Sequence, residues 1–381
     1  MSELQAIKDS FFDSSDGQER LQRWFGQRAS GPEATRAATL AELCTCFDAQ
    51  SHQLRALFAL YGGALVEGGV DASPLARAML GPLTEALTSA RRMVRRAREL
   101  RAAAAGEEDE ELTEGGHEVW LDASPLPGAL VAQLKAEDRD AFDGFLSLGL
   151  WFRPFVAAFS RVPALLPEAR RHEALVALVD ELHTADQSVH WMYTLLHALG
   201  GETVVVLVPE SGEGFRVAVS GCIDMGQFTT LLSDPLDAAF RKVGAKGRAS
   251  QDMLDVARGL GPQQGEGVYG SNVHFFPWQA MDPVTGLPVS DRVEWRAPGG
   301  TGTGSLPADF LVADAPVLDG ERVLLLVGPR APGIPGFVRI LSSGRAFESL
   351  PAALHVTPLT ADETRRWLAR VREAASPHAV N

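Results

Sequence analysis

The chain has 381 residues, of which 45% are hydrophobic, and its 49 acidic and 35 basic residues give a formal net charge of −14. This negative charge excludes a general nucleic-acid binder, because affinity for phosphates requires a basic surface, and no DNA partner is expected. The sequence contains no signal segment and no stretch approaching about 18 uncharged apolar residues, so we expect a cytoplasmic protein without membrane contact. Three cysteines cannot form a disulfide framework.

The first part of the sequence predicts a helical domain at residues 1–105. Apolar residues recur at helical spacing over 3–28, 33–66 and 73–105, and Gly31-Pro32 separates the first two stretches. The stretch 106–117 follows, with five consecutive acids at residues 107–111 and glycines at both ends. Because Leu112 is its one large apolar side chain, the stretch offers little to a core and is predicted to be an acidic linker.

Six arginines crowd the end of the third predicted helix: Arg91, Arg92, Arg95, Arg96, Arg98 and Arg101. One interpretation is a solvated helix end, where guanidinium groups favour the C-terminal dipole and pair with the acids at 107–111. The other is an anion or RNA contact made by Arg91, Arg92, Arg95 and Arg96, because the planar guanidinium group suits phosphate. The nearby acids would compete for such a site.

Residues 118–200 are predicted to form a helical segment that packs on both halves of the chain. Helical spacing covers 128–134, 138–161 and 168–199, and the aromatic residues of 138–161 are typical of core packing. In the helix predicted at 168–199, one apolar stripe must face a core. The stripe consists of Leu178, Leu182, Ala185, Val189, Met192, Leu196 and Leu199.

The opposite face of this predicted helix carries polar residues three and four positions apart, which we call the histidine band. Its members are His183, Asp186, His190, Tyr193 and His197. At this spacing His183, Asp186 and His190 project from successive turns, where they could share a zinc or other transition-metal ion. The alternative is a polar outer face or a hydrogen-bonded seam that holds no cofactor.

Residues 201–381 are predicted to be a mixed α/β domain. Strands are expected at 203–208, 215–220, 268–279, 292–296, 322–327, 336–341 and 352–357. Helices are expected at 227–243, broken near Pro235, at 250–260 and from Thr360, and Gly200-Gly201 is expected to end the preceding helix. The whole chain should therefore have an α+β fold, with a helical N-terminal half followed by a mixed sheet of about five to seven strands with packed helices.

The start of this second half contains an ordered series of short motifs. It shows, in order, Gly200-Gly201-Glu202, an apolar strand, Pro209-Glu210, Gly214-Phe215-Arg216-Val217, Ser220-Gly221 and Leu231-Leu232. This order resembles a family of uncharacterised bacterial proteins, and the similarity extends to Trp367-Leu368. The resemblance covers at most the second half of the chain. It implies that this half is one unit, and it implies no activity.

Two further stretches of the second half are candidates for binding. His274 lies in an aromatic strand and is interpreted either as a satisfied core histidine or as part of a pocket with Tyr269, Asn272 and Trp278. Gly299–Gly304 has the composition of a phosphate-cradling loop. Because it lacks the lysine and the helix that such a loop requires, it is expected to be a flexible surface loop.

The sequence leaves two functions of different classes. Signatures of serine hydrolases, kinases and zinc proteases are missing, and Cys-x-x-Cys does not occur. Together with the acidic charge, this favours an accessory or regulatory protein that binds a protein partner, with a basic partner as an immunity protein would have. The alternative is a metal-dependent hydrolase that uses the histidine band. The partner, any ligand or reaction, and the oligomeric state stay open.

Overall fold

A computed structural model describes residues 3–11, 16–48, 51–104, 119–260, 269–271, 273–289, 292, 294–297, 300–329, 339–341 and 350–376. The chain divides into two compact units, Met1–Leu196 and His197–Asn381. The first unit is built from helices and one short hairpin, and the second is a mixed sheet with helices on both faces. The α+β fold predicted from the sequence is therefore confirmed. The predicted acidic linker at 106–117 lies outside the described residues.

The first unit begins with α1 (Glu3–Asp9), α2 (Gly17–Ala29), α3 (Glu33–Cys44), α4 (His52–Glu67) and α5 (Ser73–Ala104). The stretches predicted as single helices at 3–28 and 33–66 are each divided in two. Helix α4 has its own start because the Ser51 hydroxyl accepts a hydrogen bond from the backbone N of Leu54 at 3.4 Å. Such an N-cap satisfies one of the free N–H groups of the first turn.

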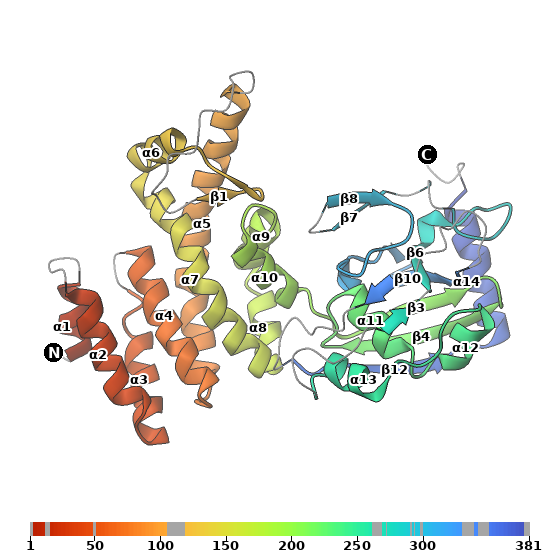
Figure 1. Cartoon of the computed structure of the whole chain (residues 1–381), viewed down its shortest axis with the longest axis horizontal. Coiled ribbons are helices and arrows are strands. Elements are labelled where there is room, and N and C mark those ends of the chain that lie inside the picture. The colour runs from red at the N-terminus through yellow and green to blue at the C-terminus, as the bar shows by residue number, and fades with distance from the viewer. Residues whose placement is uncertain are drawn as a thin grey trace. The chain divides into compact units, whose positions relative to one another are not determined.

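Helix α7 lies at the centre of the first unit. It follows the hairpin β1 (Trp120–Leu121) and β2 (Ser124–Pro125) and helix α6 (Gly128–Glu137), and runs from Arg139 to Arg161. Figure 1 shows it beside α4 and α5, and it packs along both and along α10. Its aromatic residues Trp151, Phe155 and Phe159 are fully buried, as the predicted core role requires.

Two glycines allow α7 to approach its neighbours closely. A Cβ atom at Gly144 would stand 2.6 Å from the Cβ of Ser89 on α5, and one at Gly63 on α4 would stand 2.8 Å from the Cα of Pro154. Larger side chains at either glycine would push the helices apart. Because α7 joins α4 and α5, residues 119–196 and the N-terminal helices form one unit, where the sequence predicted a separate domain ending at residue 105.

The single helix predicted at 168–199 is wrong. The structure has α8 (Leu166–Arg170), preceded by a 3-10 turn at Pro163–Leu165, then α9 (Glu173–Leu182) and α10 (Gln187–Leu196). The second break falls at Asp186, whose Oδ1 accepts hydrogen bonds from the backbone N atoms of Ser188 at 2.8 Å and Val189 at 3.2 Å. A side chain that caps a new helix competes with continuation of the old one.

The apolar stripe survives this break. All seven of its residues, from Leu178 to Leu199, are buried, so the predicted inner face is confirmed. The predicted helix end is not, because α10 stops at Leu196 and Gly200 and Gly201 begin the next strand.

The second unit is organised around one mixed sheet, in the strand order β12-β4-β3-β10-β6 with β9 also pairing to β10. The strands are β3 (Gly200–Val208), β4 (Glu213–Ser220), β6 (His274–Pro277), β9 (Val317–Leu318), β10 (Glu321–Val327) and β12 (Ala353–Pro358). Strands β3 and β10 pair in parallel, and the other pairs are antiparallel. This confirms the predicted mixed sheet. Separate two-stranded ladders are formed by β5 (Tyr269–Ser271) with β11 (Arg339–Leu341) and by β7 (Glu294–Ala297) with β8 (Gly300–Thr303).

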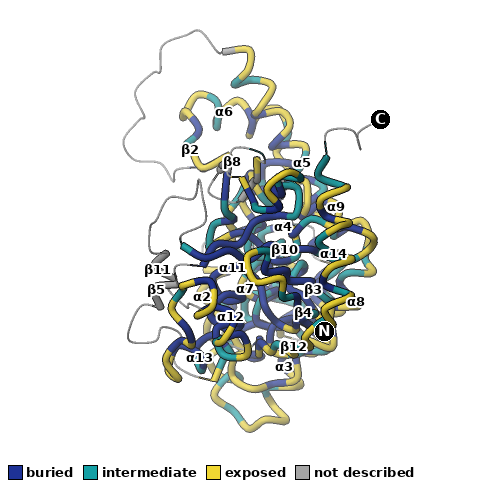
Figure 2. The backbone as a smooth tube through the Cα atoms, turned by 90° about the vertical axis from the view of Figure 1, so that its right-hand side faces the viewer, coloured by how far each residue is buried: buried dark blue, intermediate teal, exposed yellow. Residues whose placement is uncertain are grey.

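Helices cover both faces of this sheet. Along β3, Val204, Val206 and Val208 join the core beneath α11 (Met225–Leu232), α12 (Asp237–Lys242) and α13 (Gln251–Arg258). The intervening Val205 and Leu207 join the opposite core with α14 (Ala361–Ala374). A strand buried on both faces needs an unbroken apolar run, and Figure 2 shows β3 and β10 as buried.

The helices of the second unit follow their sequence signals. Pro235 separates α11 from α12, and α14 begins with the predicted capping box between Thr360 and Glu363. None of the described helices has the length and apolar character needed to cross a membrane.

Candidate functional site

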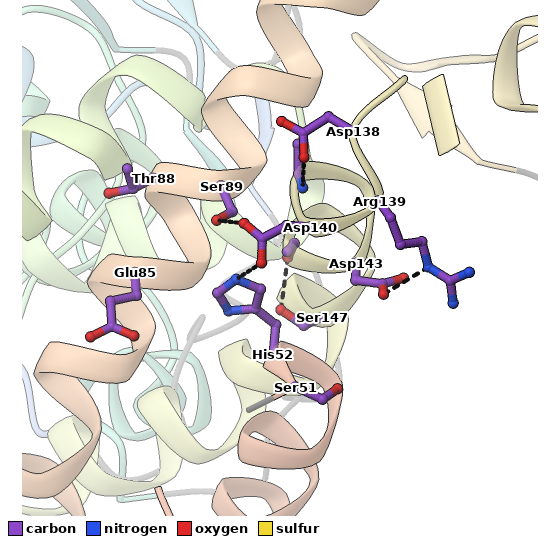
Figure 3. Close-up of polar contacts among 12 residues, drawn as sticks. Ser51, His52, Glu85, Thr88, Ser89, Asp138, Arg139, Asp140, Asp143 and Ser147 are labelled. Carbon is purple, nitrogen blue, oxygen red and sulfur yellow. Dashed lines mark hydrogen bonds and ion pairs between the residues drawn. The ribbon is translucent and has the colours of Figure 1, made fainter. Parts of the chain in front are cut away.

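A pocket of about 460 Å³ lies on the first unit, along one face of α5, and we call it the His52 pocket. Its lining is His52, Arg55, Gly81, Thr84, Glu85, Thr88, Ser89, Asp140 and His172. The residues from α5 are three or four positions apart, which places them on one side of that helix. Figure 3 shows Glu85, Thr88 and Ser89 along α5, with His52 and Asp140 coming from α4 and α7.

A hydrogen-bonded network around Asp140 holds three helices together at this pocket. His52 Nε2 lies 3.2 Å from Asp140 Oδ1. The other carboxylate oxygen accepts hydrogen bonds from Ser89 Oγ and from Arg92 Nη2, each at 2.8 Å. Arg92 also donates from Nε to Asp138 Oδ2 at 3.0 Å, and Asp138 caps α7.

The network keeps both aspartates ionised. Burial raises the pKa of Asp140, but its bonds from Arg92 and Ser89 and the nearby His52 outweigh this effect, so the pKa is below its usual value. The hydrogen bond from Arg92, with that from the backbone of Ala141, lowers the pKa of Asp138. Both carboxylates are therefore negative at neutral pH.

His52 is held with one ring nitrogen engaged and the other without a partner. The side chain is 9% exposed. Because Nε2 faces a carboxylate oxygen, that nitrogen carries the ring proton, and in the neutral imidazole Nδ1 bears a lone pair. Nδ1 is buried and makes no hydrogen bond, and the same holds for Nδ1 of His172. Buried polar atoms without partners are rare in folded proteins.

Among the residues that line the pocket, no hydroxyl or thiol is bonded to His52. The hydroxyl of Ser89 donates to Asp140 rather than to His52, and no cysteine lines the pocket. Serine–histidine–aspartate catalysis requires the histidine to stand between the other two groups. The pocket therefore combines a fixed imidazole with hydroxyl and carboxylate groups, without the geometry of such a triad.

The predicted arginine cluster is engaged in ion pairs. Arg91 and Arg95 pair with Glu181, at 3.6 and 2.7 Å, and Arg96 pairs with Glu137 at 2.8 Å. Arg92 binds Asp138 and Asp140 as described above.

The two remaining arginines of the cluster also bind within the first unit. Arg98 pairs with Asp122 at 2.6 Å, and Arg101 donates to backbone carbonyls of the β1–β2 hairpin. The six arginines thus bind groups of other elements of the first unit, and the predicted pairing with 107–111 lies outside the described residues. Since each guanidinium group is matched in this way, the anion or RNA contact predicted for Arg91, Arg92, Arg95 and Arg96 has no support.

The histidine band is not a ligand set in the structure. The Asp186 carboxylate caps α10, and burial raises its pKa against the effect of those backbone bonds. His183 Nδ1 lies 2.8 Å from the carbonyl oxygen of Asp180, and its ring stacks on Tyr193 with centroids 4.1 Å apart. The rings of His183 and His190 have centroids 6.4 Å apart.

These positions disagree with the predicted metal site. Within the part of the chain that the structure describes, no group of three or more His, Cys, Asp or Glu side chains is placed to hold a metal ion. The broken helix is the physical reason, because the predicted spacing holds only along one continuous helix. The fifth member, His197, lies beyond the end of α10 and begins the second unit.

The pocket predicted around His274 is divided between elements. His274 is fully buried in β6, with Nδ1 3.3 Å from Ser305 Oγ, which fits the core interpretation. Tyr269 begins β5, which pairs with β11 and not with the central sheet, and Trp278 packs against the core under α14. Asn272 lies outside the described residues.

Within the glycine-rich stretch at 299–304, residues 300–303 form a strand where a loop was expected. Gly300–Thr303 forms β8 and pairs with β7 in an antiparallel ladder, and Gly299 lies outside the described residues. The expectation failed because it rested on composition, and glycine in a strand gives no periodic signal.

One perturbed carboxyl in the second unit has a structural role. Burial raises the pKa of Asp224 to about 6. Its Oδ1 accepts a hydrogen bond from the backbone N of Gln227 at 2.7 Å, as the N-cap of α11. A raised pKa alone is a weak sign of function when a cap explains the position.

Sequence reasoning missed the His52 pocket. Its residues come from positions 52, 81–89, 140 and 172, which no local spacing connects. The available signal was polar Thr84, Thr88 and Ser89 on a helix that is otherwise apolar on its inner side.

In comparisons with known proteins, no family model matches the chain, and neither a curated protein nor a solved structure is similar to it. The resemblance of the second half to a family of uncharacterised bacterial proteins therefore stays a prediction.

Proposed function

We propose that the chain is a cytoplasmic accessory or regulatory protein, immunity-like in kind, that binds a basic protein partner. The supporting observation is the distribution of charge. Residues 105–118 contain seven acids and no lysine or arginine, which is half of the formal net charge of −14. An acidic segment of this kind attracts a basic partner over a distance of about a Debye length.

The arginines that precede this acidic segment have partners among the described residues. The six at positions 91–101 bind acids of α6, α7 and α9, Asp122 and backbone carbonyls. They therefore stabilise the packing of the first unit, and their positive charges pair with groups of that unit. We therefore propose that the charge of residues 105–118 acts on other molecules.

The alternative of a metal-dependent hydrolase loses its basis. It rested on the histidine band, and Asp186 is engaged as a helix cap while His183 stacks on Tyr193. Among the described residues no other group has the three ligands that a catalytic zinc ion requires.

The proposal is tested by neutralising the acidic segment in the full chain, with poly-L-lysine as the probe. The variant carries Glu107→Gln, Glu108→Gln, Asp109→Asn, Glu110→Gln and Glu111→Gln. The control carries the same charge change on exposed acids elsewhere, namely Glu19→Gln, Glu33→Gln, Glu67→Gln, Glu173→Gln and Asp252→Asn.

At about 20 mM salt, calorimetry should show at least a tenfold loss of affinity for the segment variant and less than about a threefold loss for the control. Equal losses in the two variants would mean that the probe reports net charge alone. That outcome, or unchanged binding by the segment variant, contradicts the proposal.

A further inference from the structure

The His52 pocket presents hydrogen-bond acceptors to a ligand. The hydroxyl hydrogen of Thr84 is used in a bond to the carbonyl of Leu80 at 2.7 Å, and that of Thr88 in a bond to the carbonyl of Thr84 at 2.8 Å. Ser89 donates its hydrogen to Asp140. A hydroxyl whose hydrogen is engaged offers only its lone pairs.

The imidazoles add to this acceptor character. In the neutral tautomer with its proton on the Asp140 side, His52 has a lone pair at Nδ1, and this atom makes no hydrogen bond within the described part of the chain. His172 contributes a second buried Nδ1 without a partner. Reaching these atoms requires a ring or a neighbouring side chain to turn. A donor group on a ligand would then satisfy an acceptor that the protein leaves open.

The charge of the lining is negative. Glu85 and Asp140 are carboxylates, and the lining has one guanidinium group, that of Arg55, which pairs with Glu85. The side chains of Glu85 and Asp140 are 63% and 59% exposed, so a ligand can meet them directly. Although Arg55 and Arg92 already pair with these carboxylates, a cation with several N–H donors fits their exposed oxygens and the lone pairs of the lining.

We infer that the His52 pocket binds an alkylammonium group. The group is either part of a small amine or the end of a lysine side chain of a protein partner. Its three N–H donors match the carboxylate of Glu85, the hydroxyl oxygens of Thr84 and Thr88 and the imidazole of His52. This inference concerns other residues than the acidic segment, so either proposal can fail without the other.

Gly81 provides a way to fill the pocket without disturbing the helix. It lines the pocket within α5, and a Cβ atom added there would meet no atom within 4 Å. Gly26 in α2 is a matched control, because it is also within a helix with open space at its Cβ and is not part of the lining. Gly81→Leu should close the pocket, and Gly26→Leu should not.

The experiment titrates the full chain with butylamine, followed by NMR or calorimetry, at pH 7. Wild type and Gly26→Leu should bind, and Gly81→Leu should bind at least tenfold more weakly with an unchanged melting temperature. If Gly81→Leu unfolds, Thr88→Val replaces it, because this substitution removes one acceptor at constant shape; it should bind at least threefold more weakly.

Two peptides separate the sources of the ammonium group. A neutral peptide with one lysine and its lysine-acetylated form are titrated in the same way. Binding of the lysine peptide alone, lost in Gly81→Leu, indicates a partner's side chain, and binding of butylamine alone indicates a small amine. No binding of either probe contradicts the inference. Equal binding by Gly81→Leu, or binding of zinc or inorganic phosphate in place of the amine, also overturns it.

Discussion

The first unit contains two places where histidines meet an aspartate, and they differ in how they are assembled. In the histidine band, His183, Asp186 and His190 are close in sequence, yet Asp186 serves the backbone of α10. In the His52 pocket, His52 and Asp140 are far apart in sequence, and three helices bring them together. Polar residues that are close along a predicted helix thus indicate a ligand site only when their side chains are not already hydrogen-bonded to the backbone, as that of Asp186 is.

The two aspartates also differ in their ionisation. Burial raises the pKa of Asp186, whereas bonds from Arg92 and Ser89, with His52 nearby, lower the pKa of Asp140 by more than its partial desolvation raises it. The charge of Asp140 is therefore favoured by the guanidinium group of Arg92, whereas burial disfavours the charged form of Asp186. The following predictions test this difference, beginning with the packing on which both places depend.

Met192→Asp should give the largest effect. Met192 is fully buried on the inner side of α10, behind the histidine band, and a carboxylate there would have no partner. We expect a loss of about 3–5 kcal/mol in the free energy of unfolding, measured by urea titration. Gln187→Asp, at the exposed start of the same helix, is the control and should change stability little. An unchanged Met192→Asp protein would mean that the stripe does not face a core.

Gly144→Ala should separate the helices that build the His52 pocket. The added Cβ would stand 2.6 Å from the Cβ of Ser89, so α5 and α7 must move apart, at a cost of about 1–3 kcal/mol. Gly149→Ala on the same helix has Ser188 Oγ as its nearest atom at 4.0 Å, and should gain about 0.5 kcal/mol from helix propensity. Thermal unfolding of both variants gives the comparison. Equal stability of the two would contradict the close approach of α5 and α7.

Arg92→Gln should lower stability in a way that depends on pH. Arg92 lowers the folded-state pKa of Asp138 and Asp140, so its contribution is present above the unfolded value of about 3.9 and is lost as pH falls through the lower folded value. Because these groups are partly exposed, we expect only about 0.5–1 kcal/mol at pH 7. Urea titrations at pH 7 and pH 3 measure it. Arg23→Gln is the control, and a loss that persists unchanged at pH 3 would contradict the electrostatic explanation.

Asp186→Asn should show the opposite sign. The folded pKa of Asp186 is raised, so ionisation costs stability as pH rises from the unfolded value of about 3.9 through the higher folded value. Asparagine and aspartate are about equally good N-cap residues, but asparagine carries no charge. The variant should therefore be more stable than wild type at pH 7, and the two should converge below about pH 4. A variant that is less stable at pH 7 would show that the charge favours the helix dipole more than burial opposes it.

The sequence predicted those parts of the fold that depend on periodicity. The buried stripe behind the histidine band, the strands β3 and β10 and the capping box of α14 all follow from residues that are neighbours in the chain. The break at Asp186 was missed because an aspartate fits both a polar helix face and an N-cap. The His52 pocket was missed because contacts between residues 52, 89 and 140 exist only after α7 packs between α4 and α5.

The smallest effect is expected for the double variant His183→Ala/His190→Ala, which tests whether the histidine band is anything more than a partly exposed polar face. If the two rings held a metal ion, purified wild-type protein would carry close to one equivalent of zinc, and the variant would lose it. The structure instead engages His183 through the carbonyl of Asp180 and the ring of Tyr193, contacts that contribute little at the surface. We therefore expect no stoichiometric metal by mass spectrometry and a change within about 0.5 kcal/mol, with His355→Ala on the exposed side of β12 as the control. One equivalent of metal in wild type, removed by the double substitution, would mean that the histidine band is a metal site after all and would restore the hydrolase hypothesis.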